Sequence, residues 1–152
     1  MFFTALIFGI LSGSLALVME LAVLNFTGSI SYSPLLPNFA ALPTLALTAL
    51  IEESARFLLL RQYVVRFLSE SALSWQAILA IGTLFGLGFA TLELTLILSQ
   101  ESAPYMALIG IVLVHIALST LFLFCLLRSR SLSTLLVLFS GFALHLCYNL
   151  AR

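Results

Sequence analysis

Charge is scarce in this sequence. Of its 152 residues, 8% are charged and 62% are hydrophobic. Soluble domains contain about 25% charged and about 45–50% apolar residues, so the composition excludes an ordinary soluble domain and predicts an integral membrane protein. Lysine and aspartate are absent, because all six basic residues are arginine and all six acidic residues are glutamate. With no net charge and no basic patch, the sequence gives no indication of a nucleic-acid partner.

Cysteine is rarer still. Cys125 and Cys147 lie far apart in apolar stretches, and neither belongs to a CxxC or a zinc-binding spacing. We interpret both as small buried hydrophobic residues. The first four residues also lack the positive charge of a signal peptide, so residues 2–24 are interpreted as a retained first membrane span.

Long apolar runs dominate the sequence instead. A helix of about 20 mostly apolar residues crosses a bilayer. Five segments qualify: residues 2–24, 43–67, 75–98, 105–127 and 132–151. The predicted fold class is therefore all-α, a polytopic membrane helix bundle of about five transmembrane helices, with residues 1–152 forming one integral membrane domain.

The arginines predict an orientation for this bundle. Five spans place the two termini on opposite sides of the membrane. Arg61, Arg66, Arg128 and Arg130 then fall on the side of the N-terminus, and Arg152 falls on the other side. The positive-inside rule predicts a multi-pass protein of the cell membrane with its N-terminus in the cytoplasm and its C-terminus outside.

Ionisable residues nevertheless occur inside the predicted spans, where a charge costs about 2.5–3.5 kcal/mol at the bilayer centre. These ionisable residues and one amide side chain form a candidate site. Its members are Glu52, Glu53, Arg56, Glu93, His115, His145 and Asn149. A rise of about 1.5 Å per residue puts most of them in one layer, roughly 8–15 Å below the outer ends of their spans. We expect them to converge from four helices into one buried hydrolytic site. Glu20, near the end of the first span, is interpreted instead as an interfacial residue solvated by lipid headgroups.

The pair of adjacent acids suits acid–base chemistry. Glu52 and Arg56 lie one helical turn apart and can pair directly, while Glu53 points about 100° away. One acid can thus be held by the arginine while the other faces a cavity, and two adjacent carboxylates in a low dielectric resist double ionisation. The alternative is an ion network that only packs helices together.

In the third predicted span, the acidic residue lies on the same face as two glycines. Glu93 lies seven residues after Gly86 and eleven after Gly82, so the three share one helical face. Another backbone can approach the helix there.

The order of these residues resembles that of the PrsW-type intramembrane proteases. That family belongs to a wider superfamily of CAAX proteases and bacteriocin-processing enzymes, which also includes the multi-span scaffold subunit of gamma-secretase. The matching motifs, within residues 50–150, are EExxR at 52–56, FxxxE at 89–93, the histidine at 115 and HxxxN at 145–149. Arg56 replaces a commoner lysine, and Leu94 stands where the family often has asparagine.

The resemblance implies an intramembrane endopeptidase whose substrate is a membrane-anchored protein or peptide. In that family pattern, Glu52 or Glu53 activates water, and His115 or Glu93 helps to hold it. His145 and Asn149 stabilise the oxyanion.

Cofactor and function both have alternatives. We expect metal-free catalysis, since no HExxH motif occurs. Zinc is the alternative, with Glu53, Glu93, His115 and His145 as candidate ligands. The alternative functions are a catalytically silent scaffold, or a small proton-coupled carrier with a Glu and His relay. Carriers usually contain internal repeats, and we find none in this sequence.

Overall fold

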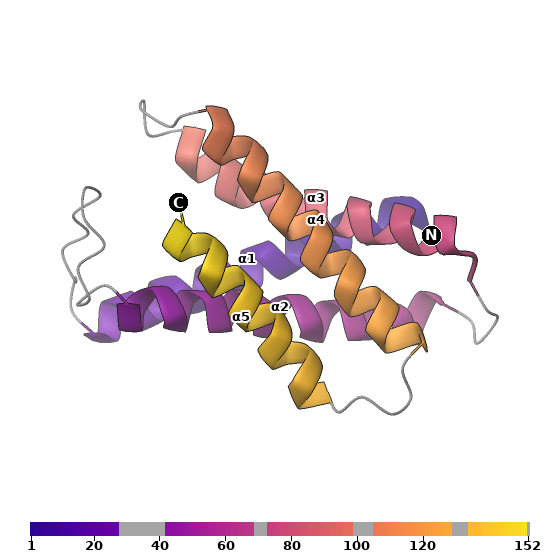
Figure 1. Cartoon of the computed structure of the whole chain (residues 1–152), viewed down its shortest axis with the longest axis horizontal. Coiled ribbons are helices and arrows are strands. Elements are labelled where there is room, and N and C mark those ends of the chain that lie inside the picture. The colour runs from indigo at the N-terminus through magenta and orange to yellow at the C-terminus, as the bar shows by residue number, and fades with distance from the viewer. Residues whose placement is uncertain (28–41, 69–72, 99–104, 129–133, 152) are drawn as a thin grey trace.

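The described residues of the computed structural model form five α-helices (Figure 1). They are α1 (Phe2–Thr27), α2 (Leu42–Phe67), α3 (Trp75–Leu98), α4 (Tyr105–Arg128) and α5 (Thr134–Ala151). The structure describes residues 1–27, 42–68, 73–98, 105–128 and 134–151, and no strand occurs among them. Each helix agrees within a few residues with one predicted span, so the all-α bundle of five helices is confirmed.

Local sequence explains where these helices begin. Pro43 is the second residue of α2, where a missing N–H leaves no helical hydrogen bond unmade. Ser74 precedes α3, and its Oγ accepts a hydrogen bond from the backbone N–H of Ala77 at 3.2 Å, as an N-cap residue does. Within the helices, the hydroxyls of Ser14 and Thr91 donate to the carbonyl oxygen four residues earlier. These polar groups are therefore satisfied without leaving the bundle.

Glycines set how closely α3 lies against its two neighbours. On the α1 side, a Cβ at Gly88 would collide with the α1 backbone, and a Cβ at Gly9 would collide with the carbonyl oxygen of Phe85. On the α4 side, a Cβ at Gly86 would lie 2.7 Å from the carbonyl oxygen of His115. Helix α3 is therefore packed backbone to backbone between α1 and α4, as the glycine spacing before its acid predicted.

Large apolar side chains fill the half of the bundle that contains the N-terminus. Tyr63 is buried there, and its hydroxyl donates to the carbonyl oxygen of Met1 at 2.9 Å. The buried core cluster comprises Ala5, Phe57, Leu60, Tyr63, Ile78, Ile81, Phe85, Phe122, Leu123 and Val137. The polar residues of the chain's interior lie beyond this core, toward the opposite half.

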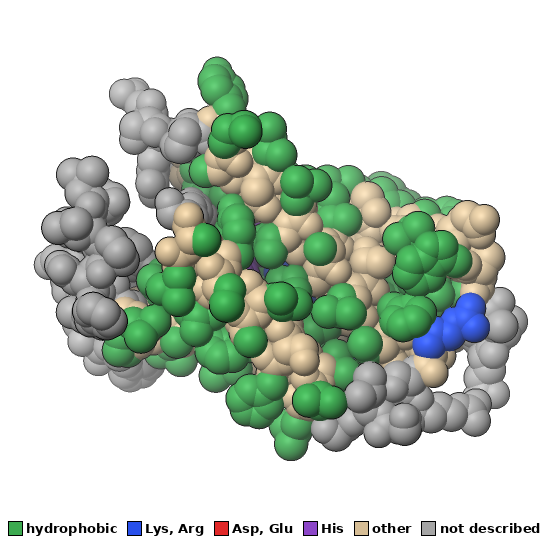
Figure 2. Space-filling view, viewed as in Figure 1, with side chains coloured by type: hydrophobic (Ala, Val, Ile, Leu, Met, Phe, Trp, Pro, Cys, Tyr) green, Lys and Arg blue, Asp and Glu red, His purple; other side chains and the backbone are tan. Residues whose placement is uncertain are grey.

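Three helices are long and apolar enough to cross a membrane: α1 over Phe2–Val23, α3 and α4. Helix α2 misses this criterion because of its glutamates and arginines, and the apolar part of α5, Leu135–Ala151, is short. Hydrophobic side chains are spread over most of the face shown in Figure 2, where a basic patch lies at one edge and no acidic side chain is seen among the described residues. Such a surface suits lipid rather than water. The chain is therefore described as a membrane protein.

Both cysteines were predicted to be buried, and one of them is not. Cys125 is half-buried, but Cys147 is exposed on α5. The interpretation of Cys147 as buried is wrong, because it lies on the opposite side of α5 from the inward-facing Gly141 and His145.

Candidate active site

Two charged residues of α2, Glu53 and Arg56, are completely buried. The Arg56 guanidinium donates from Nη1 to Glu53 Oε1. The arginine thus pairs with Glu53 and not with Glu52, the partner suggested by a spacing of four residues. Spacings of three and four both bring side chains together on a helix. Here Glu53 and Arg56 face α4 and α5, whereas Glu52 faces α1 and α3.

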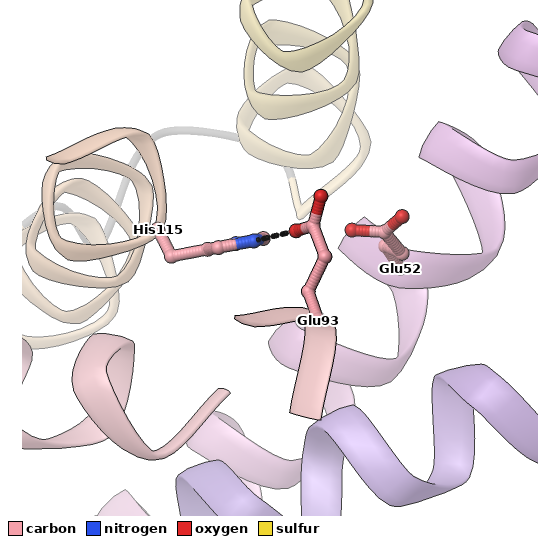
Figure 3. A group of neighbouring side chains, drawn as sticks. All are labelled: Glu52, Glu93 and His115. Atoms are coloured by element: carbon pink, nitrogen blue, oxygen red, sulfur yellow. Dashed lines mark hydrogen bonds and ion pairs between the residues drawn. The ribbon is translucent and has the colours of Figure 1, made fainter. Parts of the chain in front are cut away.

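Arg56 also fixes the protonation of His115 on α4. Its Nη2 is hydrogen-bonded to Nδ1 of the fully buried His115 ring. A guanidinium has only donors, so Nδ1 is the acceptor and the ring proton is on Nε2. That Nε2 lies 2.7 Å from Glu93 Oε2 on α3 and donates to it (Figure 3). A chain of hydrogen bonds therefore runs from Arg56 through His115 to Glu93 and orients the Glu93 carboxylate.

His145 brings α5 into the same cluster. Its Nδ1 lies 2.6 Å from Glu53 Oε1, so one carboxylate oxygen contacts both Arg56 and His145. Its Nε2 lies 3.6 Å from Glu52 Oε2. His145 thus spans the two adjacent acids. Both partners of Glu53 contact its Oε1, and its buried Oε2 has no hydrogen-bond partner among the described residues.

A cavity of about 60 Å³ lies between α1, α2 and α3. Glu52 and Glu93 line it, and Figure 3 shows their carboxyl groups facing one another. Glu52 Oε2 has no hydrogen-bond partner within the described part of the chain. Of the two adjacent acids, Glu52 is the one that lines this cavity.

Glu20 of α1 lines the same cavity, which the interpretation as an interfacial residue missed. A signal for it was present in the sequence. Glu20 lies seven residues after Gly13 and eleven after Gly9, the same offsets that place Glu93 after Gly86 and Gly82. Since α1 and α3 pack through their glycines, the face that carries Glu20 is turned into the bundle.

Asn149 is the one predicted site residue that lies at the edge of the cluster. It is half-buried, one turn beyond His145 on α5. No hydrogen bond joins its amide to another described residue of the cluster. The structure thus brings together six of the seven predicted residues and places the seventh next to them along the helix.

Three side chains of the cluster lie close enough together to be considered as ligands of a metal ion. Carboxylate oxygens of Glu52 and Glu93 and a ring nitrogen of His115 lie within 4.8 Å of one another, a plausible ligand set for zinc by residue type. A histidine nitrogen must lose its proton to bind a metal, whereas the Arg56 contact at Nδ1 leaves the proton on Nε2. Of the candidate ligands predicted from sequence, Glu93 and His115 belong to this group, and Glu53 and His145 lie outside it. A metal at these three residues would require His115 Nε2 to give up its proton.

Comparison with known proteins adds no relative: no protein-family model, curated protein or solved structure matches this chain.

Proposed function

We propose that this protein is an intramembrane hydrolase that cleaves a peptide bond of a membrane-anchored protein or peptide, with water activated by Glu52. One observation carries the proposal: the carboxyl groups of Glu52 and Glu93 face each other in a partly open cavity of about 60 Å³ between α1, α2 and α3. That volume exceeds the roughly 10–15 Å³ that one water molecule needs, so the cavity has room for water. Water and a potential base are thus brought together in a low dielectric.

Glu52 is the proposed base because it lines the cavity and Glu53 does not. Glu53 is held by Arg56 and His145, so its role is to position these two side chains. Glu52 accepts the proton of the water, and the oxygen of that water attacks the carbonyl carbon of the substrate. Glu93, held by His115, accepts the second hydrogen bond of the water and orients it.

The oxyanion is assigned to α5. The proposed donors are His145, whose Nε2 lies 3.6 Å from Glu52 Oε2, and Asn149, which follows one turn later on α5. Donors fixed in a dry site stabilise developing charge strongly, and loss of one costs about 10²–10³ in rate. The order of the motifs, which resembles that of PrsW-type proteases, supports the same assignment.

We further propose five membrane crossings with the N-terminus in the cytoplasm. The Tyr63–Met1 hydrogen bond places the end of α2 at the N-terminal end of the bundle, and Arg128 Nη2 donates to the carbonyl oxygen of Leu73 at 3.0 Å. The ends of α2 and α4 and the start of α3 therefore gather at this end, and their arginines favour the cytoplasmic side. The cavity lies in the other half of the bundle, so cleavage takes place toward the outer face.

Proteolysis in reconstituted bilayers tests the proposal. The full chain is mixed with a panel of single-span substrates, and the products are identified by mass spectrometry. We expect Glu52→Gln to lower the cleavage rate about 10²–10⁴-fold, as expected for loss of a general base. Arg61→Gln, at an exposed position of the same helix, serves as the control and is expected to cleave normally.

Chelation of metals is the second arm of that experiment. Activity that survives chelator supports water activated by a carboxylate alone. Activity lost with chelator and restored by zinc, or a Glu52→Gln variant that cleaves as fast as the original chain, contradicts the proposal.

A catalytically silent scaffold is the second candidate, and the network around Arg56 favours it. Contacts of Arg56, His115 and His145 join α2 to α3, α4 and α5, which suits a purely structural role. Under this alternative, no substrate is cleaved and Glu52→Gln leaves binding of a partner protein unchanged.

A further inference from the structure

The aromatic ring of Phe89 contacts two members of the buried network from a third helix. Phe89 belongs to α3, and 3% of its surface is exposed. The Cζ atom of Arg56 on α2 lies 4.3 Å from the centre of its ring. The ring of His115 on α4 is centred 4.8 Å away, with 37° between the two ring planes. One aromatic side chain thus packs on the guanidinium and on the imidazole to which that guanidinium is hydrogen-bonded.

Phe89 also forms part of the wall of the cavity. It lines the cavity together with Glu52 and Glu93, whereas Arg56 and His115 are not among the described residues that line it. The ring therefore contacts the cavity as well as the buried network. An apolar side chain in this place limits the access of cavity water to the guanidinium, so its donors stay with their buried acceptors.

The arrangement of His115 matters for the acid that it contacts. A neutral imidazole has a proton on one nitrogen only, and the Arg56 donor at Nδ1 leaves that proton on Nε2. The Nε2 atom donates it to Glu93 Oε2 at 2.7 Å. If the guanidinium moved away from Nδ1, or the imidazole turned over about χ2, the proton would no longer be directed at Glu93. Attraction of a desolvated guanidinium to the ring face, and packing of the ring on the imidazole, oppose both movements.

We propose that Phe89 is a positioning residue of the site: its ring holds Arg56 and His115 in the arrangement that directs the imidazole proton at the carboxylate on α3. This inference rests on the proposed hydrolysis, because in that reaction the carboxylate of Glu93 orients the attacking water. Phe89 lies one turn before Glu93, so the same helix carries the acid and the ring that fixes its hydrogen-bond donor.

Nitrogen NMR of the full chain in bilayers tests the positioning without any substrate. Protonated and unprotonated imidazole nitrogens differ widely in chemical shift, so the two tautomers are distinguished. The chain has two histidines, and the signals of His115 are those that His115→Asn lacks. We expect a single tautomer, with the proton on Nε2, in the original chain. A mixture of both tautomers is expected in Phe89→Leu, which has no aromatic face.

Three further variants separate positioning from packing. Phe89→Met fills the space with another aliphatic side chain and should give the same mixture. Phe89→Tyr keeps an aromatic face and should restore the single tautomer. Phe85→Leu is the matched control, because it removes the same ring from the apolar core one turn earlier on α3. It should destabilise the bundle to a similar degree without changing the tautomer of His115.

Cleavage kinetics provide the functional readout. We expect Phe89→Leu to lower kcat by about 10–10²-fold with little change in KM, since a misplacement of about 1 Å can cost about 10²-fold in rate. Phe89→Tyr and Phe85→Leu should stay close to the original kcat. A rise in KM alone would show that the ring contacts substrate instead, and would overturn the positioning role.

Separate results overturn separate claims. If Phe89→Leu keeps the single tautomer, or Phe85→Leu gives the same mixture, the positioning role is wrong, and the proposed hydrolysis stands as long as Glu52→Gln alone is inactive. If the tautomers change as expected but the original chain cleaves no substrate, the hold of Phe89 on His115 is supported and the hydrolysis is rejected.

Discussion

At the scale of single residues, Arg56 contacts three other side chains of the bundle. Its guanidinium donates to Glu53 and to His115, and its Cζ lies 4.3 Å from the centre of the Phe89 ring. A planar guanidinium can serve two acceptors and an aromatic face at once, which an ammonium group cannot. Proteases of the PrsW type, whose motif order this sequence resembles, commonly have lysine at this position. Arginine suits the neighbours that Arg56 has here.

Removal of this side chain should destabilise the bundle. Arg56→Gln leaves the buried Glu53 carboxylate without its cation, which costs about 3–5 kcal/mol in free energy of unfolding. Arg61→Gln, at an exposed position, should change it by about 0.5 kcal/mol or less. Unfolding of both variants by denaturing detergent measures the difference. Equal stability of the two would show that the Glu53–Arg56 pair contributes nothing.

The sequence predicted most of these residues but not their pairing. A charged or imidazole side chain inside an apolar run is conspicuous, so Glu53, Arg56, Glu93 and His115 could be found without coordinates. Both acids lie within about one turn of Arg56 on the same helix, so the pairing depends on the neighbouring helices: His115 of α4 contacts Arg56, and His145 of α5 contacts Glu53. The position of Glu20 at the cavity was not predicted, because its distance from the end of its span was considered and the glycine face it shares was not.

At the scale of helices, glycine sets the distance between α1 and α3, and with it the width of the cavity. The two helices meet where Gly9 faces the backbone of Phe85 and Gly13 faces that of Phe89. A Cβ at Gly13 would lie 3.0 Å from the Phe89 carbonyl oxygen, whereas at Gly9 the approach is closer still. The contact is therefore tighter near the N-terminal core than beside the cavity.

This gradient predicts different effects for two similar substitutions. Gly9→Ala forces the helices apart, and overpacking of this kind costs about 1–3 kcal/mol. Gly13→Ala requires a smaller displacement, and alanine's better helix propensity offsets part of its cost by about 1 kcal/mol. Thermal unfolding of the two variants in the same detergent compares them. A larger loss for Gly13→Ala than for Gly9→Ala would contradict this account of the packing.

At the scale of the whole molecule, apolar length predicted all five helices. Each run of about 20 apolar residues became one helix, because a backbone in lipid must satisfy its hydrogen bonds within the segment. The relative placement of the helices could not be predicted in the same way. It depends on contacts such as Gly86 with α4 and His145 with α2, which join segments distant in the sequence.

Orientation can be tested on the whole chain. A reporter enzyme that matures only outside the cytoplasm, fused after Arg152, should be active, because five crossings from a cytoplasmic N-terminus end outside. The same reporter fused in the connection between α2 and α3 should be inactive. The reverse pattern would place the arginine-rich end outside and the cavity toward the cytoplasm.

The cluster's contacts across the chain have a consequence for biosynthesis. Arg56 is bonded to a histidine 59 residues later, and Glu53 to one 92 residues later. When α2 leaves the ribosome, neither partner has yet been made, so its buried charges have only each other. We therefore expect α2 to stay beside the insertion machinery, or at the membrane surface, until α4 and α5 have been synthesised. A chain truncated after α4 should accordingly be retained there and degraded, which makes completion of the last helix a checkpoint for assembly of the site.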